Sequence, residues 1–106
     1  QQNNVKEATS LFRAALKVRK SYSPALYQMA QLYYNEKTYQ LAKAYLDRFL
    51  AVSGLTAQNA WLAYRIEHEL GNENQITYFA NKMKSEFPDS EETALLYKME
   101  QQQSEN

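Results

Sequence analysis

The chain of 106 residues contains no cysteine, two glycines, two prolines and one histidine. Without cysteine it has no disulfide framework and no thiolate chemistry. It also lacks any run of about 18 apolar residues, so the sequence predicts no membrane-spanning helix. Its formal net charge of zero argues against nucleic acid as a general partner, because binding to phosphates requires a basic face.

The residue types that perform catalysis are sparse as well. His68 lies between Glu67 and Glu69, but consecutive residues of a helix point in different directions and cannot converge on one metal ion. The acidic pair Glu91-Glu92 is better explained by its favourable interaction with a helix N-terminus. There is no glycine-rich phosphate loop and no pair of histidines. We therefore expect no enzyme activity, no cofactor, no metal site and no small-molecule substrate.

The charge that is present is unevenly distributed along the chain. In the first twenty residues, one glutamate, Glu7, accompanies a set of basic residues: Lys6, Arg13, Lys17, Arg19 and Lys20. Among the charged residues of the last twenty positions, acidic residues predominate. We interpret both ends as solvated faces of helices.

Residues 23–54 have the pattern of two antiparallel helices joined by a short turn. Ser23 is placed to N-cap the first helix and Pro24 to occupy its first turn. Gly54 is placed to end the second helix as a C-cap. Apolar residues recur at helical spacing in two stripes on either side of the polar turn 35–38: Leu26, Met29, Ala30, Leu32 and Tyr33, then Tyr39, Ala42, Tyr45, Leu46, Phe49 and Leu50.

This pattern recurs at a fixed period along the chain. Ala8 stands 34 residues before Ala42, and Pro88 stands 34 residues after Gly54. The pattern resembles the tetratricopeptide repeat (TPR), a helix–turn–helix of about 34 residues with small residues where its helices cross. The positions of the TPR pattern are occupied here by Met29, Ala30, Tyr33, Ala42, Leu46, Phe49 and Gly54.

We predict an all-α fold, a right-handed TPR α-solenoid of about six antiparallel helices that forms a single domain over residues 1–106. The expected parts are the second helix of a truncated repeat at 5–20, a complete repeat at 23–54, a degenerate repeat at 57–88 and a capping helix at 90–101. Asp89 and Glu92 have the spacing of a capping box for this last helix. Residues 1–4 are expected to fray and residues 101–106 to be disordered.

The two ends of the predicted stack have different expected roles. Leu95, Leu96 and Met99 should cover its C-terminal end. At the N-terminal end a helix lacks its hairpin partner, which natural solenoids avoid by capping. We therefore expect a C-terminal fragment of a longer chain, and we expect the exposed N-terminal helix to form dimer contacts.

The residues of the first helices that remain after the core is assigned are candidates for protein binding. They are Tyr27, Gln31, Tyr34 and Asn35, and then, at the same period, Trp61, Arg65 and His68. First helices line the concave surface of a TPR solenoid, so these residues should form one groove wall. Aromatic residues and arginine dominate binding hot spots. The alternative is that the aromatic members pack between helices.

A more specific resemblance covers most of the chain. The stretch SPALYQMAQLYYNEKTYQLAKAYLDRFL and the later NKMKSEFPDSEE look like the C-terminal half of type IV pilus biogenesis lipoproteins of the PilF/PilW kind. The resemblance rests on Tyr33-Tyr34 before the turn and on Phe87-Pro88-Asp89-Ser90 after the last repeat. It implies a pilotin, which helps the pilus secretin to assemble in the outer membrane.

The same resemblance implies a location and a partner. The parent protein would be a lipoprotein at the periplasmic face of the bacterial outer membrane, held by an N-terminal lipid on a lipobox cysteine that this chain lacks. Its partner would be the secretin or a segment of it. Two alternatives remain open, a generic bacterial TPR adaptor or co-chaperone for another assembly, and a regulatory domain attached to an enzyme.

Overall fold

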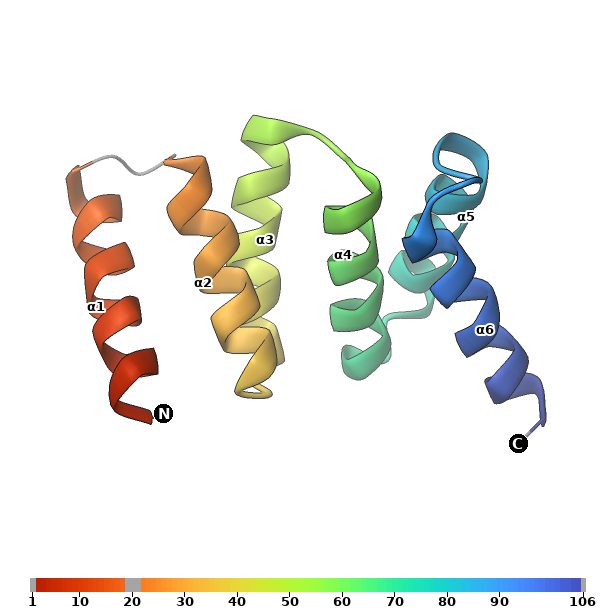
Figure 1. Ribbon diagram of the computed structural model, residues 1–106, viewed down its shortest axis with the longest axis horizontal. Helices are drawn as coiled ribbons and strands as arrows, with labels where there is room; N and C mark the ends of the chain where they lie inside the picture. The colour runs from red at the N-terminus through yellow and green to blue at the C-terminus, as the bar shows by residue number, and fades with distance from the viewer. Residues whose placement is uncertain (1, 19–21, 106) are drawn as a thin grey trace. The chain divides into compact units, whose positions relative to one another are not determined.

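The computed structural model describes residues 2–18 and 22–105, and within them the chain forms helices and no strand (Figure 1). The helices are α1 Gln2–Val18, α2 Ser23–Asn35, α3 Tyr39–Ser53, α4 Ala57–Leu70, α5 Glu73–Glu86 and α6 Glu91–Glu105. The predicted all-α fold is confirmed. The expected first helix extended to residue 20, and residues 19 and 20 lie outside the described residues.

The chain divides into two compact units, Gln1–Gly54 and Leu55–Asn106. The first unit holds α1, α2 and α3, and the second holds α4, α5 and α6. Each unit has its own buried apolar residues.

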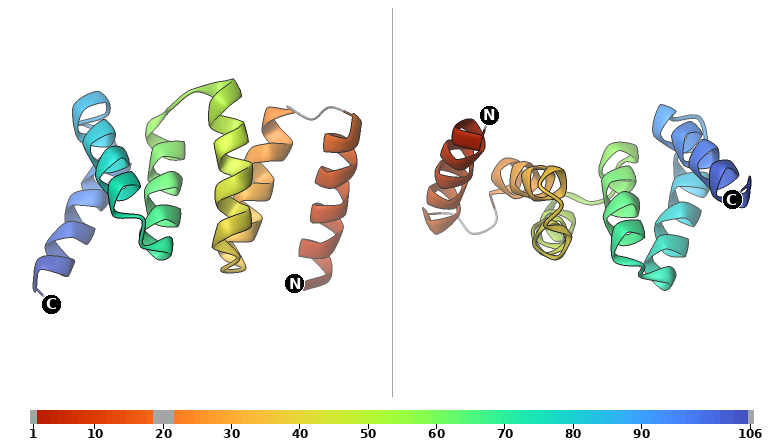
Figure 2. Two further views of the ribbon diagram at one scale, coloured as in Figure 1. Left: turned by 180° about the vertical axis from the view of Figure 1, so that it is seen from behind. Right: turned by 90° about the horizontal axis from the view of Figure 1, so that it is seen from below.

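The first unit is built around the hairpin of α2 and α3, which lie side by side in all views (Figures 1 and 2). Ala30 of α2 and Ala42 of α3 are both fully buried, and so are Leu26 and Met29. Alanine has no side chain beyond Cβ, so a buried alanine on each helix is compatible with a close crossing. Helix α1 packs against α2 and contributes the buried Leu16.

The N-terminus of α2 differs from the prediction. The N-cap residue is Tyr22, not Ser23, and it makes no side-chain capping hydrogen bond. Its carbonyl oxygen accepts the first helical bond, from Leu26 N at 3.1 Å, so Ser23 is already inside the helix. Pro24 lies in the first turn as expected. Gly54 ends α3 as predicted, with a φ of 77° that disfavours residues with a Cβ atom.

In the second unit α4 and α5 form a hairpin and α6 packs against both. Its buried side chains include Tyr64, Ile66, Met83 and Leu96. A reciprocal capping box between Thr56 and Asn59 starts α4. Thr56 Oγ1 accepts from Asn59 N, and Asn59 Oδ1 accepts from Thr56 N. A glycine in the left-handed conformation, Gly71, ends the helix (φ 74°).

The start of α6 also differs from the prediction by one residue. Asp89 lies in the preceding turn, and Ser90 is the residue that caps the helix. Ser90 Oγ accepts from Thr93 N at 3.1 Å, and Ser90 O accepts from Ala94 N at 3.2 Å. The Thr93 hydroxyl is buried and donates to Phe87 O at 2.7 Å. The predicted pairing of Asp89 with Glu92 is therefore wrong, because Asp89 is one residue too early for the cap.

The two ends of the described chain are more helical than predicted. Residues 2–4 belong to α1, and residues 101–105 continue α6. Leu96 is fully buried as expected and Met99 is half-buried, whereas Leu95 has 48% of its surface exposed and does not cover the unit. The expectation that residues 101–105 are disordered is wrong, because Gln103 packs its side chain onto α4.

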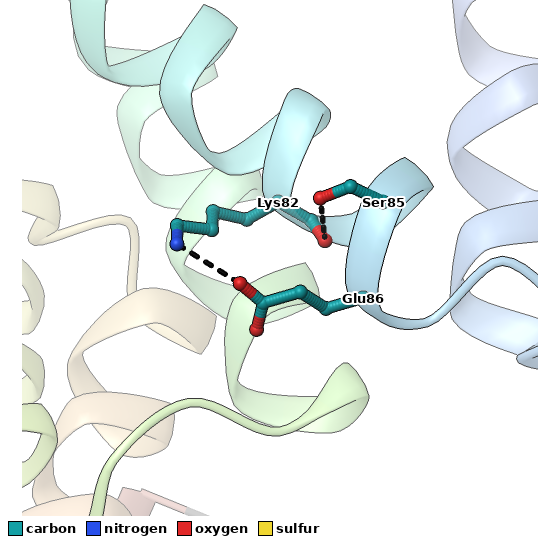
Figure 3. A network of polar contacts seen from close by, with 3 residues as sticks. All are labelled: Lys82, Ser85 and Glu86. Carbon is teal, nitrogen blue, oxygen red and sulfur yellow. Dashed lines mark hydrogen bonds and ion pairs between the residues drawn. The ribbon is translucent and has the colours of Figure 1, made fainter.

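The exposed side of α5 carries a short polar network (Figure 3). Lys82 Nζ lies 2.9 Å from Glu86 Oε2, one helical turn away, and Ser85 Oγ donates to Lys82 O at 3.4 Å. The carboxylate of Glu86 raises the pKa of Lys82. Such exposed pairs contribute little to stability, so we attribute the fold of this unit to its apolar residues.

Candidate functional site

The predicted binding residues of the first unit lie along one side of α2. Tyr27, Gln31 and Tyr34 are spaced by about one turn, as residues that share a helix face are, and all three are half-buried. Asn35, the last residue of the helix, is exposed. These residues therefore present part of their surface to solvent in a row.

Both tyrosines of this row also pack against aromatic residues of α3. The Tyr27 ring lies 4.8 Å from the ring of Phe49, and the Tyr34 ring lies 5.7 Å from that of Tyr39. Each of these tyrosines contacts another aromatic ring and is only partly exposed to solvent. The alternative made from the sequence, packing of these aromatic rings between helices, is therefore observed for Tyr27 and Tyr34, while their role in a groove wall stays a prediction.

The second unit brings Trp61 and Arg65 of α4 together. The Arg65 guanidinium lies 5.1 Å from the centroid of the Trp61 ring, and Arg65 Nε donates to Trp61 O at 3.3 Å. The indole stacks in turn on the buried ring of Tyr64, with centroids 5.7 Å apart and planes 10° from parallel. Burial raises the pKa of the Tyr64 phenol. The half-buried indole and guanidinium are therefore held in one arrangement before any partner arrives.

His68 lies in the same unit but in a different environment. Its ring stacks on Tyr64 with centroids 6.0 Å apart, and its Nε2 atom accepts from the side-chain amide of Gln103 of α6 at 2.6 Å. The Nδ1 atom is buried and has no hydrogen-bond partner among the described residues. Helix α6 therefore covers this side chain in part, which the sequence did not predict.

Neighbouring polar residues of α4 have structural roles. Glu67 is buried and its carboxylate accepts from Asn72 Nδ2 at 2.6 Å, while Glu67 O accepts from Asn72 N at 3.1 Å. This pair holds the turn that follows α4. Among the described residues, no three acidic or histidine side chains are gathered in a way that would hold a metal ion. Nor does the described part of the chain contain a helix with the length and hydropathy of a membrane span.

The predicted site residues thus fall into separate groups. Trp61 and Arg65 form one contact pair, His68 lies partly beneath α6, and the row on α2 belongs to the other unit. That the faces of α2 and α4 form one continuous groove wall stays a prediction.

A groove in the first unit was missed by sequence reasoning. It has a volume of about 810 Å³ and is lined by residues of α1, α2 and α3. The signal for it was the excess of basic residues in the first twenty positions, since Arg13 and Lys17 both line the groove.

Comparison with solved structures supports the fold. The chain superposes on the crystal structure of PilW, a widely conserved type IV pilus biogenesis factor, with a TM-score of 0.83 and 22% sequence identity over 91% of this chain. It superposes on PilF of Pseudomonas aeruginosa with a TM-score of 0.82 and 22% identity over 93% of this chain. The chain has a TPR-type helical fold.

The match covers 44% of the PilW chain and 45% of the PilF chain, so this sequence spans less than half the length of either structure. The resemblance predicted from the sequence is confirmed at the level of the fold. No family model matches the chain, and no curated protein matches it.

Proposed function

We propose that this chain is a protein-binding scaffold that acts in type IV pilus biogenesis and carries out no chemical reaction. The observation that carries the proposal is the half-buried Trp61–Arg65 pair on α4, together with the fold shared with PilW, a type IV pilus biogenesis factor. TPR-type solenoids bind their partners on extended surfaces formed by stacked helices. The row of Tyr27, Gln31 and Tyr34 on α2 would supply further contacts.

The arrangement of Trp61 and Arg65 suits recognition of an extended or helical segment. The indole offers apolar area, and the guanidinium offers several N–H donors for carbonyl or carboxylate oxygens of the partner. Because Arg65 is already held by Trp61 O and the indole ring, less side-chain entropy is lost on binding. Binding of this kind is non-covalent, and its specificity depends on which segment fits the pair.

The finer proposal is that the parent protein is a pilotin. In this role it would recognise a segment of the pilus secretin and help it to assemble in the outer membrane. The parent protein would be held at the periplasmic face of that membrane by a lipid anchor outside this chain. The residues that would contact the secretin are those on α2 and α4: Tyr27, Gln31, Tyr34, Asn35, Trp61, Arg65 and His68.

A titration followed by NMR tests this proposal. The chain has a single tryptophan, so one indole N–H signal reports Trp61 alone. Adding soluble segments of the cognate secretin to the isotope-labelled protein should shift this signal and the backbone amides around Arg65. Arg65→Ala should weaken binding by about thirtyfold or more, as expected for loss of a hot-spot arginine, and Lys98→Ala, at an exposed position of α6, should not.

The outcomes of this titration separate the proposals. Shifts confined to residues away from α2 and α4, or none at millimolar partner, would contradict the proposed site. Binding of other envelope proteins but not of the secretin, at the same residues, would favour the generic adaptor.

The predicted dimer contact has one feature in its support. Leu11 of α1 has 70% of its surface exposed and lines a shallow hollow of about 530 Å³ with Lys6, Glu7 and Ser10. We expect weak self-association through this face, and we expect Leu11→Lys to abolish it without loss of helix content. Sedimentation equilibrium over a range of concentrations checks this. A wild-type protein that stays monomeric, or a variant that associates equally, would contradict it.

A further inference from the structure

The groove of the first unit combines an apolar floor with basic walls. Leu26 of α2 and Leu16 of α1, both buried, form the floor together with Ala51 and the Tyr45 ring of α3. In the view from behind, α2 is seen between α1 and α3 (Figure 2, left). The groove therefore runs between α1 and α3 over α2.

All charged side chains that line the groove, among the described residues, are cations: Arg13 and Lys17 on α1, and Arg48 on α3. No carboxylate of the described residues is among the lining groups. A wall of positive charges repels cations and attracts anions. This effect is strongest where an apolar floor excludes water. The groove thus selects for negative charge.

Two of these cations are held by an aromatic pair at the centre of the unit. Tyr33 and Tyr45 stack with ring centroids 5.6 Å apart. Arg13 donates a hydrogen bond from α1 to the Tyr33 hydroxyl, and the Arg48 guanidinium lies 5.5 Å from the centroid of the Tyr45 ring. Both guanidinium groups are therefore positioned by contacts within the unit.

We propose that this groove binds an acidic amphipathic segment of another protein. Apolar side chains of the segment would lie on Leu16, Tyr45 and Ala51, and its carboxylates would pair with Arg13, Lys17 and Arg48. Arginine suits this task because its planar guanidinium matches a carboxylate with two parallel hydrogen bonds. The volume of about 810 Å³ is of the size that accommodates several side chains.

The shape of the groove favours a peptide segment over a membrane surface. The accessible part of the floor includes Leu16, which has only 8% of its surface exposed. A flat lipid surface would meet the exposed cations but would not reach the floor, whereas a single helix or extended segment could enter between α1 and α3.

This surface differs from the one in the proposed function. Leu26 and Tyr27 are consecutive residues of α2 and so point about 100° apart around the helix axis. The groove and the row of Tyr27, Gln31 and Tyr34 therefore lie on different sides of α2. The proposal of a groove ligand does not depend on secretin binding, and the two can fail separately.

A synthetic peptide tests the groove. The probe is a fluorescein-labelled amphipathic helical peptide with leucine on one face and glutamate at its borders, and the matched probe has glutamine in place of glutamate. Fluorescence anisotropy should show binding of the glutamate peptide, weakened by added salt because exposed charges are screened, and at least about tenfold weaker binding of the glutamine peptide.

A single substitution within the groove tests whether the peptide binds there. Ala51 is exposed and lines the groove, so Ala51→Glu adds a carboxylate beside Arg48 without removing a buried side chain. We expect at least about a tenfold loss of affinity for the glutamate peptide. The matched control is Ala94→Glu, the same change at an exposed position of α6 in the other unit, which should leave affinity unchanged. Circular dichroism should show equal helix content in both variants.

Three results would overturn the proposal. These are no binding of the glutamate peptide, equal binding of the glutamine peptide, and equal effects of Ala51→Glu and Ala94→Glu. A fourth result would show that the groove binds a lipid surface and not a peptide. In this result the protein binds vesicles that contain phosphatidylglycerol, Ala51→Glu abolishes that binding, and the peptide does not bind.

Discussion

Replacing Tyr64 by alanine is expected to lower the free energy of unfolding by about 3–5 kcal/mol, as for other large aromatic residues removed from a core. Its side chain is 1% exposed, and its ring lies against the rings of Trp61 and His68. The substitution leaves a cavity and also removes the surface on which the Trp61 indole rests. Urea denaturation followed by far-UV circular dichroism measures the loss.

Two control variants show which part of Tyr64 matters. Tyr64→Phe keeps the ring and removes only the hydroxyl, so its effect should be no more than about 1 kcal/mol. Tyr78→Ala removes a tyrosine with 49% of its surface exposed and should have an effect well below that of Tyr64→Ala. Similar losses for the alanine variants at both positions would contradict the assigned core.

Enlarging Ala42 to leucine should destabilise the first unit by about 1–3 kcal/mol, the range typical of overpacked cores. Ala42 is fully buried in the hairpin of α2 and α3, where the added atoms have no space unless the helices move apart. The matched control is Ala44→Leu on the same helix, at an exposed position, with an expected change of less than about 0.5 kcal/mol. Equal destabilisation by both variants in urea denaturation would show that the hairpin is not closely packed at Ala42.

Local sequence patterns predicted the buried faces of the helices and the glycines that end them, because both depend on residues close together in the chain. The stripes containing Ala30 and Ala42 are buried as their spacing indicated, because helical periodicity is a property of the chain itself. Gly54 and Gly71 end helices with positive φ angles, which glycine adopts without the strain that a Cβ atom causes. The same repeated pattern predicted the TPR-type fold, whereas the resemblance to PilW and PilF rested on Tyr33-Tyr34 and on Phe87-Pro88-Asp89-Ser90.

The N-cap residues of α2 and α6 were less predictable, and each lies one residue from its predicted position. Ser23 and Ser90 are both good N-cap residues, yet only Ser90 acts as one, while the cap of α2 is Tyr22. Adjacent polar residues such as Asp89 and Ser90 compete for the same role. The Thr93 hydroxyl, buried against Phe87 O, places the cap at Ser90, and this tertiary contact has no signal in local sequence.

The features missed from the sequence all join separate helices. Gln103 is one of three consecutive glutamines near the C-terminus, a pattern that does not indicate its contact with His68 of another helix. The groove requires α1, α2 and α3 together, whereas the sequence displayed only an excess of basic residues interpreted as a solvated face. Of the predicted binding residues, periodicity identified the Trp61–Arg65 neighbourhood, since residues four apart on a helix meet.

The division at Gly54 has a consequence for the time course of folding. The most extensive packing in each unit joins helices that are consecutive in the chain, α2 with α3 and α4 with α5. Contacts between residues close in sequence need little loop closure and form quickly, so helical proteins of this kind fold in microseconds to milliseconds. The first unit can therefore complete its own core without waiting for contacts from the second.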